Sequence, residues 1–320
     1  MDYLAELMPK LEKLLFSTLS GSVYEQQFNA MCLNVVKAGG KRIRPRLAIL
    51  SGLLQPSYNK EADEGLLLNC AASTELLHTA TLIHDDVIDK SSVRRGVRTL
   101  NDTSGNHLAV LAGDYLFARC FRLLKATDSH ALYHACSETT EELIAGEINQ
   151  LNKEGDLNIT LDEYYRTIFS KTGALFVLAT TAFALVKKQD DKVLDALREY
   201  GKQLGIAFQI VDDVLDYSST DETLGKKIGT DLNDKRITLP LILALKDADA
   251  EDRKQLSSAI DSADINAVTE ILTKYRSLEK SLELAKEAAC LAKKSLGIFS
   301  DNVYKQELCK IADMAADRRS

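Results

Sequence analysis

Two short aspartate-rich stretches contain the residues best suited to chemistry. The chain reads LIHDDVIDKSSVRRG at 82–96 and FQIVDDVLDY at 208–217. The aspartates have the same spacing in both: Asp85, Asp86 and Asp89, then Asp212, Asp213 and Asp216. On a helix, the first and third members of each triplet lie on one face, one turn apart. Because like charges repel each other there, we predict that something positive lies between Asp85 and Asp89.

Basic side chains form clusters although the net charge is −7. The clusters are Lys41, Arg42, Arg44 and Arg46; Arg94, Arg95 and Arg98; and Lys226 and Lys227. The negative net charge argues against a nucleic-acid partner, whereas local basic clusters in an acidic protein indicate a small anionic ligand, because Arg and Lys bind phosphate oxygens. Carboxylates without imidazole or thiolate ligands favour Mg²⁺, which commonly shares substrate phosphate oxygens. Together the patterns predict a metal-dependent site for a phosphorylated substrate.

Each feature taken alone also has an ordinary structural explanation. A single acidic triplet fits a solvated helix end with surface ion pairs, and GGKRIRP at 39–45 fits a turn with solvated cations. His78, on nearly the same helical face as the first triplet, fits a structural histidine. Lys171 and Thr172 fit the end of one helix and the cap of the next, and Gln209 fits a buried amide. Their order and spacing favour the functional interpretation.

Apolar residues recur at helical spacing along most of the chain, and strand-like blocks bounded by Gly and Pro are missing. We predict an all-α protein with a single domain over 1–320, since no linker divides the chain and 45% hydrophobic residues suffice for a large core. The predicted helices are 2–17, 22–38, 43–54, 61–88, 105–126, 130–153, 161–187, 191–218, 236–246, 251–260, 265–276, 278–298 and 303–317.

The cysteines and the apolar segments indicate the compartment. The six cysteines, which include no CxxC pair, are Cys32, Cys70, Cys120, Cys136, Cys290 and Cys309. Their scatter through apolar helices predicts reduced, buried thiols in a cytoplasmic protein. We expect no signal peptide and no stretch long and apolar enough to span a membrane.

Several sequence blocks occur in an order that covers almost the whole chain. They are GGKRIRP at 39–45, ELLHTATLIHDDVID at 75–89, RRG at 94–96, GDYLFARCF at 113–121, GEINQL at 146–151, SKTGALF at 170–176, FQIVDDVLDY at 208–217 and LGKKIGTDL at 224–232. With these blocks the chain resembles the trans-type polyprenyl diphosphate synthase family, and within it the bacterial long-chain group around octaprenyl diphosphate synthase. One aspartate triplet is weakly specific, whereas two interleaved with these blocks are strongly specific.

The resemblance implies an isoprenoid-synthase helical bundle around a deep central cavity, a homodimer, and a three-magnesium (Mg²⁺) cluster. The implied direct metal ligands are Asp85, Asp89 and Asp212, with Asp86, Asp213 and Asp216 assisting through water or orientation. The implied isopentenyl diphosphate pocket contains Lys41, Arg44, His78 and Arg95. The implied allylic side contains Arg94, Lys171, Thr172, Gln209 and Lys226, of which Lys171 and Lys226 also take part in catalysis.

One departure from the family pattern concerns the residues before TLP at 238–240. Relatives commonly read Gly-Lys there, whereas this chain has Lys235 and Arg236. A cation is kept at Arg236, and its contact with diphosphate is left open.

The implied reaction is a Mg²⁺-dependent condensation of isopentenyl diphosphate with an allylic diphosphate such as farnesyl or geranylgeranyl diphosphate. Cations and metal neutralise the leaving diphosphate, so the allylic C–O bond ionises and the isopentenyl double bond attacks the cation before a proton is lost. The implied product is a long-chain all-trans polyprenyl diphosphate, octaprenyl by resemblance, for quinone side chains.

Product length is predicted from the residues that precede the first triplet. Short-chain relatives place aromatic rings where this chain has Ala80 and Thr81, so these two and Leu77 are the predicted chain-length residues. Small side chains leave a tunnel open, although they also suit close helix packing. The tunnel floor is assigned to Leu77, to Phe121 or to the dimer partner.

Four alternatives stay open at this point. A shorter-chain farnesyl or geranylgeranyl synthase shares the motifs. A terpene cyclase shares the fold and first triplet, but DDVLD at 212–216 disfavours it. A metal phosphohydrolase with an HD pair at His84 and Asp85 leaves GGKRIRP and DDVLD unexplained. A non-catalytic partner subunit is disfavoured because both triplets are intact.

Overall fold

Helices account for nearly all of the computed structural model, which describes residues 2–20, 26–94, 96–218 and 229–317. In chain order they are α1 (Asp2–Ser20), α2 (Gln26–Lys37), α3 (Ile43–Leu53), α4 (Lys60–Ile88), α5 (Leu100–Ser104), α6 (Asn106–Lys125), α7 (His130–Asn152), α8 (Leu161–Ile168), η1 (Phe169–Gly173), α9 (Ala174–Val186), α10 (Asp191–Ser218), α12 (Thr230–Asn233), α13 (Leu239–Asp247), α14 (Ala250–Asp261), α15 (Ile265–Lys274), α16 (Ser277–Ser295), η2 (Leu296–Ile298) and α17 (Val303–Ala316). The all-α prediction is confirmed, and most helix ends lie within about three residues of the predicted ones.

The chain divides into two units, and the division passes through helices α7, α9, α10 and α17. Unit 1 consists of Met1–Glu138, Leu175–Arg198 and Leu296–Leu308, and unit 2 of Thr139–Ala174, Glu199–Ser295 and Cys309–Ser320. Each unit contributes its own buried apolar side chains. The first aspartate triplet belongs to unit 1 and the second to unit 2. The single domain over 1–320 stays a prediction.

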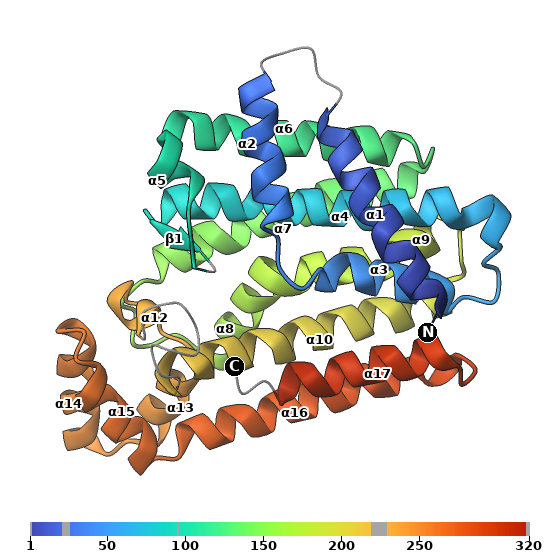
Figure 1. Cartoon of the computed structure of the whole chain (residues 1–320). Coiled ribbons are helices and arrows are strands. Elements are labelled where there is room, and N and C mark those ends of the chain that lie inside the picture. Colours follow the sequence, from blue (N-terminus) through green and yellow to red (C-terminus); the bar gives the residue numbers. More distant parts are fainter. Residues whose placement is uncertain (1, 21–25, 95, 219–228, 318–320) are drawn as a thin grey trace. The chain divides into compact units, whose positions relative to one another are not determined.

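In unit 1, α4 lies alongside α6 and also packs against α3 (Figure 1). The two long helices approach closely at Gly113 of α6, where a Cβ atom would lie only 2.1 Å from Nε2 of His84. The His84 ring lies 3.2 Å from the carbonyl oxygen of Val110 and 3.6 Å from the Asp114 carboxylate. This packing holds the end of α4, which carries the first triplet.

Local chemistry sets both ends of α4. The Asn59 side chain caps its start by accepting hydrogen bonds from the backbone N–H groups of Glu61 and Ala62 at 3.0 and 3.2 Å. The helix ends at Ile88, after which Lys90 takes a left-handed conformation with φ 52°. The chain thus turns sharply as soon as the triplet is complete.

A short antiparallel hairpin, β1 (Val93–Arg94) and β2 (Val97–Arg98), follows this turn. Gly96 at its tip has φ 75°, a conformation that glycine adopts without steric cost. The sequence did not predict the hairpin, because strands of two residues are too short to show an alternating apolar pattern.

In unit 2, α8 begins with a capping box between Thr160 and Glu163 and continues into the π-helix η1. α13 packs against α16, and α14 pairs with α15 (Figure 1). The part of α10 in this unit is buried along one face and carries the second triplet near its end.

Two helical spans contradict the expectation that no stretch is apolar enough to cross a membrane. Lys60–Ile88 and Leu161–Val186 are long and apolar enough by length and composition. Their most apolar windows are 72% and 78% buried inside the protein. This apolarity is that expected of core helices, which bury nearly their whole circumference.

The cysteine prediction is confirmed for four positions and wrong for one. None of the six forms a disulfide, and the buried ones are Cys32, Cys70, Cys120 and Cys136. Cys309 is half-buried, whereas Cys290 is exposed. Cys290 lies on the outer face of α16. The prediction was wrong because Cys290 directly follows a buried alanine, and an amphipathic pattern alone does not show which residues next to that alanine are also buried.

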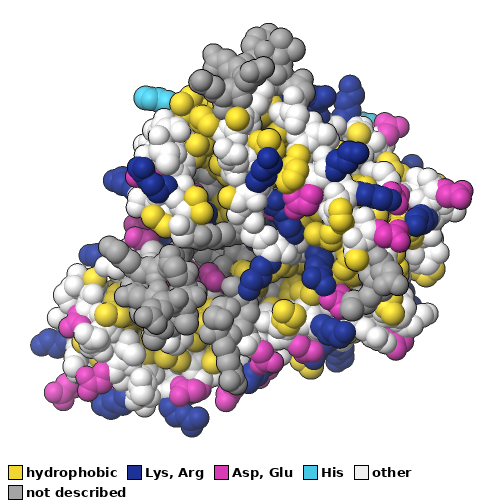
Figure 2. Space-filling model, viewed as in Figure 1, with side chains coloured by type: hydrophobic (Ala, Val, Ile, Leu, Met, Phe, Trp, Pro, Cys, Tyr) yellow, Lys and Arg dark blue, Asp and Glu magenta, His cyan; other side chains and the backbone are white. Residues whose placement is uncertain are grey.

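Charges of both signs are interspersed on the face shown in Figure 2. Within unit 1, Lys10 forms an ion pair with Glu64 at 2.6 Å and Arg46 with Glu307 at 2.5 Å. Such exposed pairs contribute only about 0–1 kcal/mol each. A basic run in the sequence therefore does not remain one basic cluster in space.

Candidate active site

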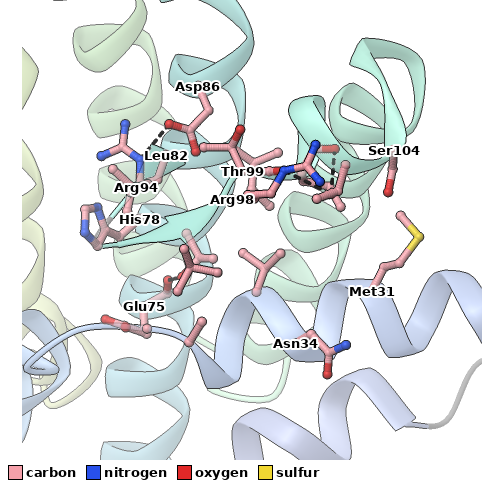
Figure 3. Close-up of a pocket in the computed structure, with 18 residues that line it drawn as sticks. Met31, Asn34, Glu75, His78, Leu82, Asp86, Arg94, Arg98, Thr99 and Ser104 are labelled. Atoms are coloured by element: carbon pink, nitrogen blue, oxygen red, sulfur yellow. Dashed lines mark hydrogen bonds and ion pairs between the residues drawn. The ribbon is translucent and has the colours of Figure 1, made fainter. Parts of the chain in front are cut away.

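The first triplet splits its three carboxylates between two sides of α4. Asp86 is buried, and its Oδ1 accepts a 2.7 Å hydrogen bond from Nε of Arg94 on β1 (Figure 3). Asp85 and Asp89 are half-buried on the neighbouring side. This division follows from helix geometry, because residue i+1 is rotated by about 100° from i whereas i+4 returns to nearly the same face. Arg94 is thus the positive partner of the middle aspartate, Asp86, and the predicted positive charge between Asp85 and Asp89 stays a prediction.

The second triplet shows the same division on α10. Asp213 is only 3% exposed, and both of its carboxylate oxygens accept hydrogen bonds: Oδ2 from the Tyr164 hydroxyl at 2.7 Å and Oδ1 from Nε2 of Gln209 at 2.8 Å. Asp212 is exposed and Asp216 is half-buried. In both triplets the middle aspartate is thus bonded inside its own unit, and the outer two lie on the more exposed side.

Asp216 also binds the start of α12. Its two carboxylate oxygens accept the backbone N–H groups of Thr230 and Asp231 at 3.2 and 2.9 Å. These N–H groups start the short helix α12, where no earlier carbonyl is available to accept them. Asp216 therefore has a structural role whether or not it binds metal.

The environment of Asp213 is unfavourable to negative charge. Burial raises the pKa of the Asp213 carboxyl well above its ordinary range, and the charges of Asp231 and Asp212 raise it further. The bonds from Gln209 and Tyr164 act in the opposite direction, because donors favour the carboxylate. Burial and the Asp213 charge also raise the pKa of Tyr164 well above its ordinary value, so the phenol remains a donor.

Lys171 and Thr172 lie on the π-helix η1, a rare element that often occurs at functional sites. Nζ of Lys171 forms an ion pair with Glu147 at 2.8 Å and donates to Oε1 of Gln150 at 3.2 Å. α7 comes this near because it has glycine at Gly146, where a Cβ atom would lie 2.8 Å from the Ser170 side chain and 2.9 Å from the Lys171 backbone nitrogen. The Thr172 hydroxyl donates to Oε1 of Gln209 at 2.7 Å.

The four cations at 41–46, three of them in GGKRIRP, have different surroundings. Arg42 is 8% exposed and binds Glu12 at 2.7 Å, Glu75 at 2.6 Å and the Val36 carbonyl at 2.6 Å. These carboxylates raise its pKa although burial alone lowers it. Arg42 is therefore a structural residue that ties α1 and α4 to the start of α3.

Two other cations of this segment, Lys41 and Arg44, are more exposed than Arg42. Lys41 is exposed, whereas Arg44 points Nη1 to within 3.0 Å of Nε2 of His78. The Arg44 guanidinium also stacks on the ring of Phe176 at 4.7 Å. The structure thus brings together Arg44 and His78, which the sequence predicted to share one pocket.

Arg42→Met is expected to lower the free energy of unfolding by about 3–5 kcal/mol, because it leaves the Glu75 carboxylate buried without its cation. Arg46→Met is the matched control within the same segment, since its pair with Glu307 is partly exposed. The control is expected to change the stability by less than about 1 kcal/mol. Urea denaturation of both variants measures the difference, and equal values would contradict the structural role of Arg42.

A cavity of about 250 Å³ lies in unit 1 between α2, α4, the hairpin and α5. Figure 3 shows Asp86, Arg94 and His78 on one side of it and Met31 and Asn34 of α2 on the other. Its wall includes apolar side chains such as Leu82 and Val97, so it differs from the polar surroundings expected for a diphosphate.

The family profile described as "Polyprenyl synthetase" matches residues 25–276 of the chain. The chain belongs to the polyprenyl synthetase family. It is an enzyme, a trans-prenyltransferase of the long-chain type.

Three curated relatives indicate the range within this family. Octaprenyl diphosphate synthase of Haemophilus influenzae is 38% identical, over 89% of this chain and 86% of that protein. The geranyl-diphosphate-specific all-trans-nonaprenyl-diphosphate synthase of Rhodobacter capsulatus is also 38% identical, over 89% and 87%. A short chain isoprenyl diphosphate synthase of Methanothermobacter thermautotrophicus is 35% identical, over 89% and 88%. Identity alone therefore does not decide the number of isoprene units.

A solved structure confirms the predicted isoprenoid-synthase fold. The polyprenyl synthase of Caulobacter crescentus CB15, complexed with calcium and isoprenyl diphosphate, superposes with a TM-score of 0.90 at 34% sequence identity. The match covers 99% of this chain and 96% of that one. A divalent ion and a diphosphate are thus bound by a relative with this fold.

Family membership removes the terpene cyclase and HD phosphohydrolase alternatives. The structure also gives a physical reason against the HD phosphohydrolase, which would need His84 as a metal ligand. The His84 ring instead lies against Val110 and Asp114 of α6. His84 thus packs between two helices of this prenyltransferase.

The donor set of the two triplets fits Mg²⁺. Within the described ranges, no three His, Cys, Asp or Glu side chains converge on one metal-sized point. Mg²⁺ in enzymes is usually bound by one or two carboxylates together with water and substrate phosphates. The oxygen-only outer pair of each triplet meets that requirement, with the substrate supplying further ligands.

Some predicted residues lie outside the described part of the chain or remain open. Arg95, Lys226 and Lys227 lie outside it. Arg236 lies 3.4 Å from Asp231 and 3.4 Å from Asp234, so it neutralises carboxylates beside the second triplet. The remaining residue roles of this prenyltransferase stay predictions.

The predicted chain-length residues differ in exposure. Leu77 and Ala80 are almost fully buried on the side of α4 that also carries His84, which contacts α6. Thr81 is half-buried, and its hydroxyl donates to the His78 carbonyl at 2.9 Å. Phe121 is 40% exposed and stacks near Tyr133, which disfavours it as the floor of an internal tunnel.

Two residues at this site were missed by the sequence interpretation. Glu147 lies in the quoted block GEINQL and pairs with Lys171, so the block contained the signal. Tyr164 is one of two adjacent tyrosines on α8 and had no distinguishing signal, because only the fold brings its hydroxyl to Asp213.

Proposed function

We propose that the protein condenses isopentenyl diphosphate with farnesyl or geranylgeranyl diphosphate to an all-trans octaprenyl diphosphate, which serves quinone side chains. The observation that carries the proposal is the repeated arrangement of the triplets, each with a bonded middle aspartate and two outer carboxylates on the more exposed side. Similarity to octaprenyl and nonaprenyl synthases supports a long product.

The outer aspartates are the residues proposed to hold Mg²⁺. Asp85, Asp89 and Asp212 bind it directly in this proposal, and Asp216 assists. When bound, the metal supplies positive charge that stabilises the departing diphosphate. That both triplets serve one three-magnesium cluster is a proposal from the family resemblance, since the structure describes each triplet within its own unit.

The remaining residues bind and orient the two substrates. Arg44, His78 and Lys41 in unit 1 bind the isopentenyl diphosphate, and Arg95 is assigned there by resemblance. Lys171, Thr172 and Gln209 in unit 2, with Arg94 and Lys226, are assigned to the allylic diphosphate. The ammonium of Lys171 and the guanidinium of Arg94 stabilise negative charge on the diphosphate as the C–O bond breaks. The departing diphosphate accepts the proton in the last step.

The proposed assembly is a homodimer in the cytoplasm. Apolar side chains exposed on unit 1 support a protein partner, namely Leu108, Leu111, Phe121 and Tyr133 of α6 and α7. Exposed apolar residues grouped on neighbouring helices often mark such surfaces. The buried thiols without disulfides support a reducing compartment.

An elongation assay tests the function. Purified protein is incubated with Mg²⁺, labelled isopentenyl diphosphate and each of geranyl, farnesyl and geranylgeranyl diphosphate, and the products are dephosphorylated and resolved by length. We expect one dominant long product, absent when a chelator removes the metal. A product that stops at farnesyl or geranylgeranyl would favour the shorter-chain alternative. No incorporation under any condition would favour the non-catalytic subunit.

A further inference from the structure

We propose that Tyr164 is a positioning residue for the allylic side of the reaction, acting through the buried Asp213 carboxylate and the Gln209 amide. The inference rests on the proposed function, because it concerns how that site binds its allylic diphosphate. None of the family blocks contains Tyr164, so its role comes from the tertiary contacts of unit 2.

A continuous chain of hydrogen bonds joins three elements of unit 2. The Tyr164 hydroxyl on α8 donates to Oδ2 of Asp213 on α10 at 2.7 Å. Nε2 of Gln209 donates to Oδ1 of the same carboxylate at 2.8 Å, and the Thr172 hydroxyl on η1 donates to Oε1 of Gln209 at 2.7 Å. Each bond fixes the orientation of the next group, so the amide of Gln209 has one favoured orientation.

The Tyr164–Asp213 end of the network is buried, so the loss of the bond between them is not compensated easily by water. Tyr164 is 4% exposed and Asp213 is 3% exposed. Among the described residues, the Tyr164 hydroxyl is the donor to Oδ2 of Asp213. A buried acceptor that loses its donor either pays the desolvation penalty or rotates toward another donor. Rotation of this carboxylate would also release the Gln209 amide.

The two ends of the network adjoin residues assigned to the reaction. Asp213 directly follows Asp212, a proposed metal ligand, and Thr172 directly follows Lys171 on the π-helix. A shift in the network therefore moves groups on the allylic side. The residues assigned to isopentenyl diphosphate, Arg44 and His78, belong to unit 1.

Tyr164→Phe tests the inference, with Tyr165→Phe as the matched control. Tyr165 is adjacent on α8, is half-buried, and its ring packs on Tyr164 at 5.6 Å. Within the described ranges its hydroxyl has no hydrogen-bond partner. The control therefore removes the same atom from the same helix without touching Asp213.

We expect Tyr164→Phe to raise the KM for farnesyl diphosphate about tenfold, equivalent to about 1.4 kcal/mol, while the KM for isopentenyl diphosphate changes less than about twofold. Calorimetry with a farnesyl diphosphate analogue that has sulfur at the bridging position, in Mg²⁺, should show a similar loss of affinity without turnover. Tyr165→Phe should match the wild type in both measurements. Equal behaviour of the two variants, or equal shifts for both substrates, would overturn the inference.

A double-mutant cycle with Asp213→Asn tests the route of the effect. If Tyr164 acts through the Asp213 carboxylate, adding Tyr164→Phe to Asp213→Asn should change analogue affinity by less than about twofold. A further tenfold loss would show that Tyr164 acts by another route and would also overturn the inference. The double-mutant cycle also keeps the inference testable if Tyr164→Phe alone folds poorly. In the Asp213→Asn background the side chain at position 213 is a neutral amide, so removing the Tyr164 hydroxyl does not leave a buried negative charge without a hydrogen-bond donor. Failure of the wild type to elongate any substrate would instead contradict the proposed function.

Discussion

Asp85→Ala and Asp212→Ala are each expected to reduce turnover by at least about 10²- to 10³-fold, the loss typical when one group that stabilises transition-state charge is removed. Both carboxylates lie on the more exposed side of their triplets. Their removal therefore opens no cavity in an apolar core, and helicity and Tm should remain nearly unchanged. Steady-state kinetics at saturating Mg²⁺, with circular dichroism on the same samples, measures both quantities.

Asp195→Ala is the matched control for the Asp212 substitution. Asp195 lies on the same helix, α10, is exposed, and pairs with Arg198 one turn later. We expect wild-type turnover from it. Wild-type turnover in a folded Asp85→Ala or Asp212→Ala variant would refute the dependence on both triplets.

Ala80→Phe is expected to shorten the product sharply, to about the length made by short-chain relatives, while condensation continues. The ring would stand one turn before the first triplet on α4, where a growing isoprenoid tail must pass if the tunnel runs along this helix. Ala80 is fully buried, so the ring also has to displace neighbours, at a cost of about 1–3 kcal/mol in stability. Thr81→Phe, at a half-buried position, tests the same level with less strain.

Leu82→Phe is the control for a ring added to the same helix. Leu82 lines the cavity between α4 and α2, whose lining residues include none of Leu77, Ala80 and Thr81. Product chromatography should show the wild-type length from this variant. Wild-type length from folded Ala80→Phe and Thr81→Phe would show that this level of α4 does not limit the tail, and that Ala80 serves close packing instead.

Helix prediction succeeded because the relevant information is local. The apolar spacing of α4 and the Asn59 cap at its start depend on residues within a few positions of one another. The hairpin at 93–98 and the π-helix at Phe169–Gly173 were missed, because each covers too few residues to produce a periodic pattern. Both elements nevertheless carry proposed site residues, Arg94 and Lys171.

The roles within the basic segment show where sequence information ends. Family resemblance selected Lys41 and Arg44 from the four cations at 41–46 and passed over Arg42. The structure shows why, since Arg42 is buried between Glu12 and Glu75, which are distant in sequence. Composition and spacing cannot distinguish the structural cation from the substrate-binding ones, because the type of a residue does not show which distant residue it will pair with in the fold.

The sequence by itself determined the all-helical fold, the two aspartate triplets, their preference for a hard cation, and the membership of a prenyltransferase family that the motif order indicated. Only the tertiary structure decided that the middle carboxylate of each triplet is buried, and which residue donates a hydrogen bond to it. Asp86 meets Arg94 eight residues later, but Asp213 meets Tyr164 forty-nine residues earlier. Helical spacing fixes the angle between neighbouring side chains, whereas the packing of other helices determines which of those directions is buried.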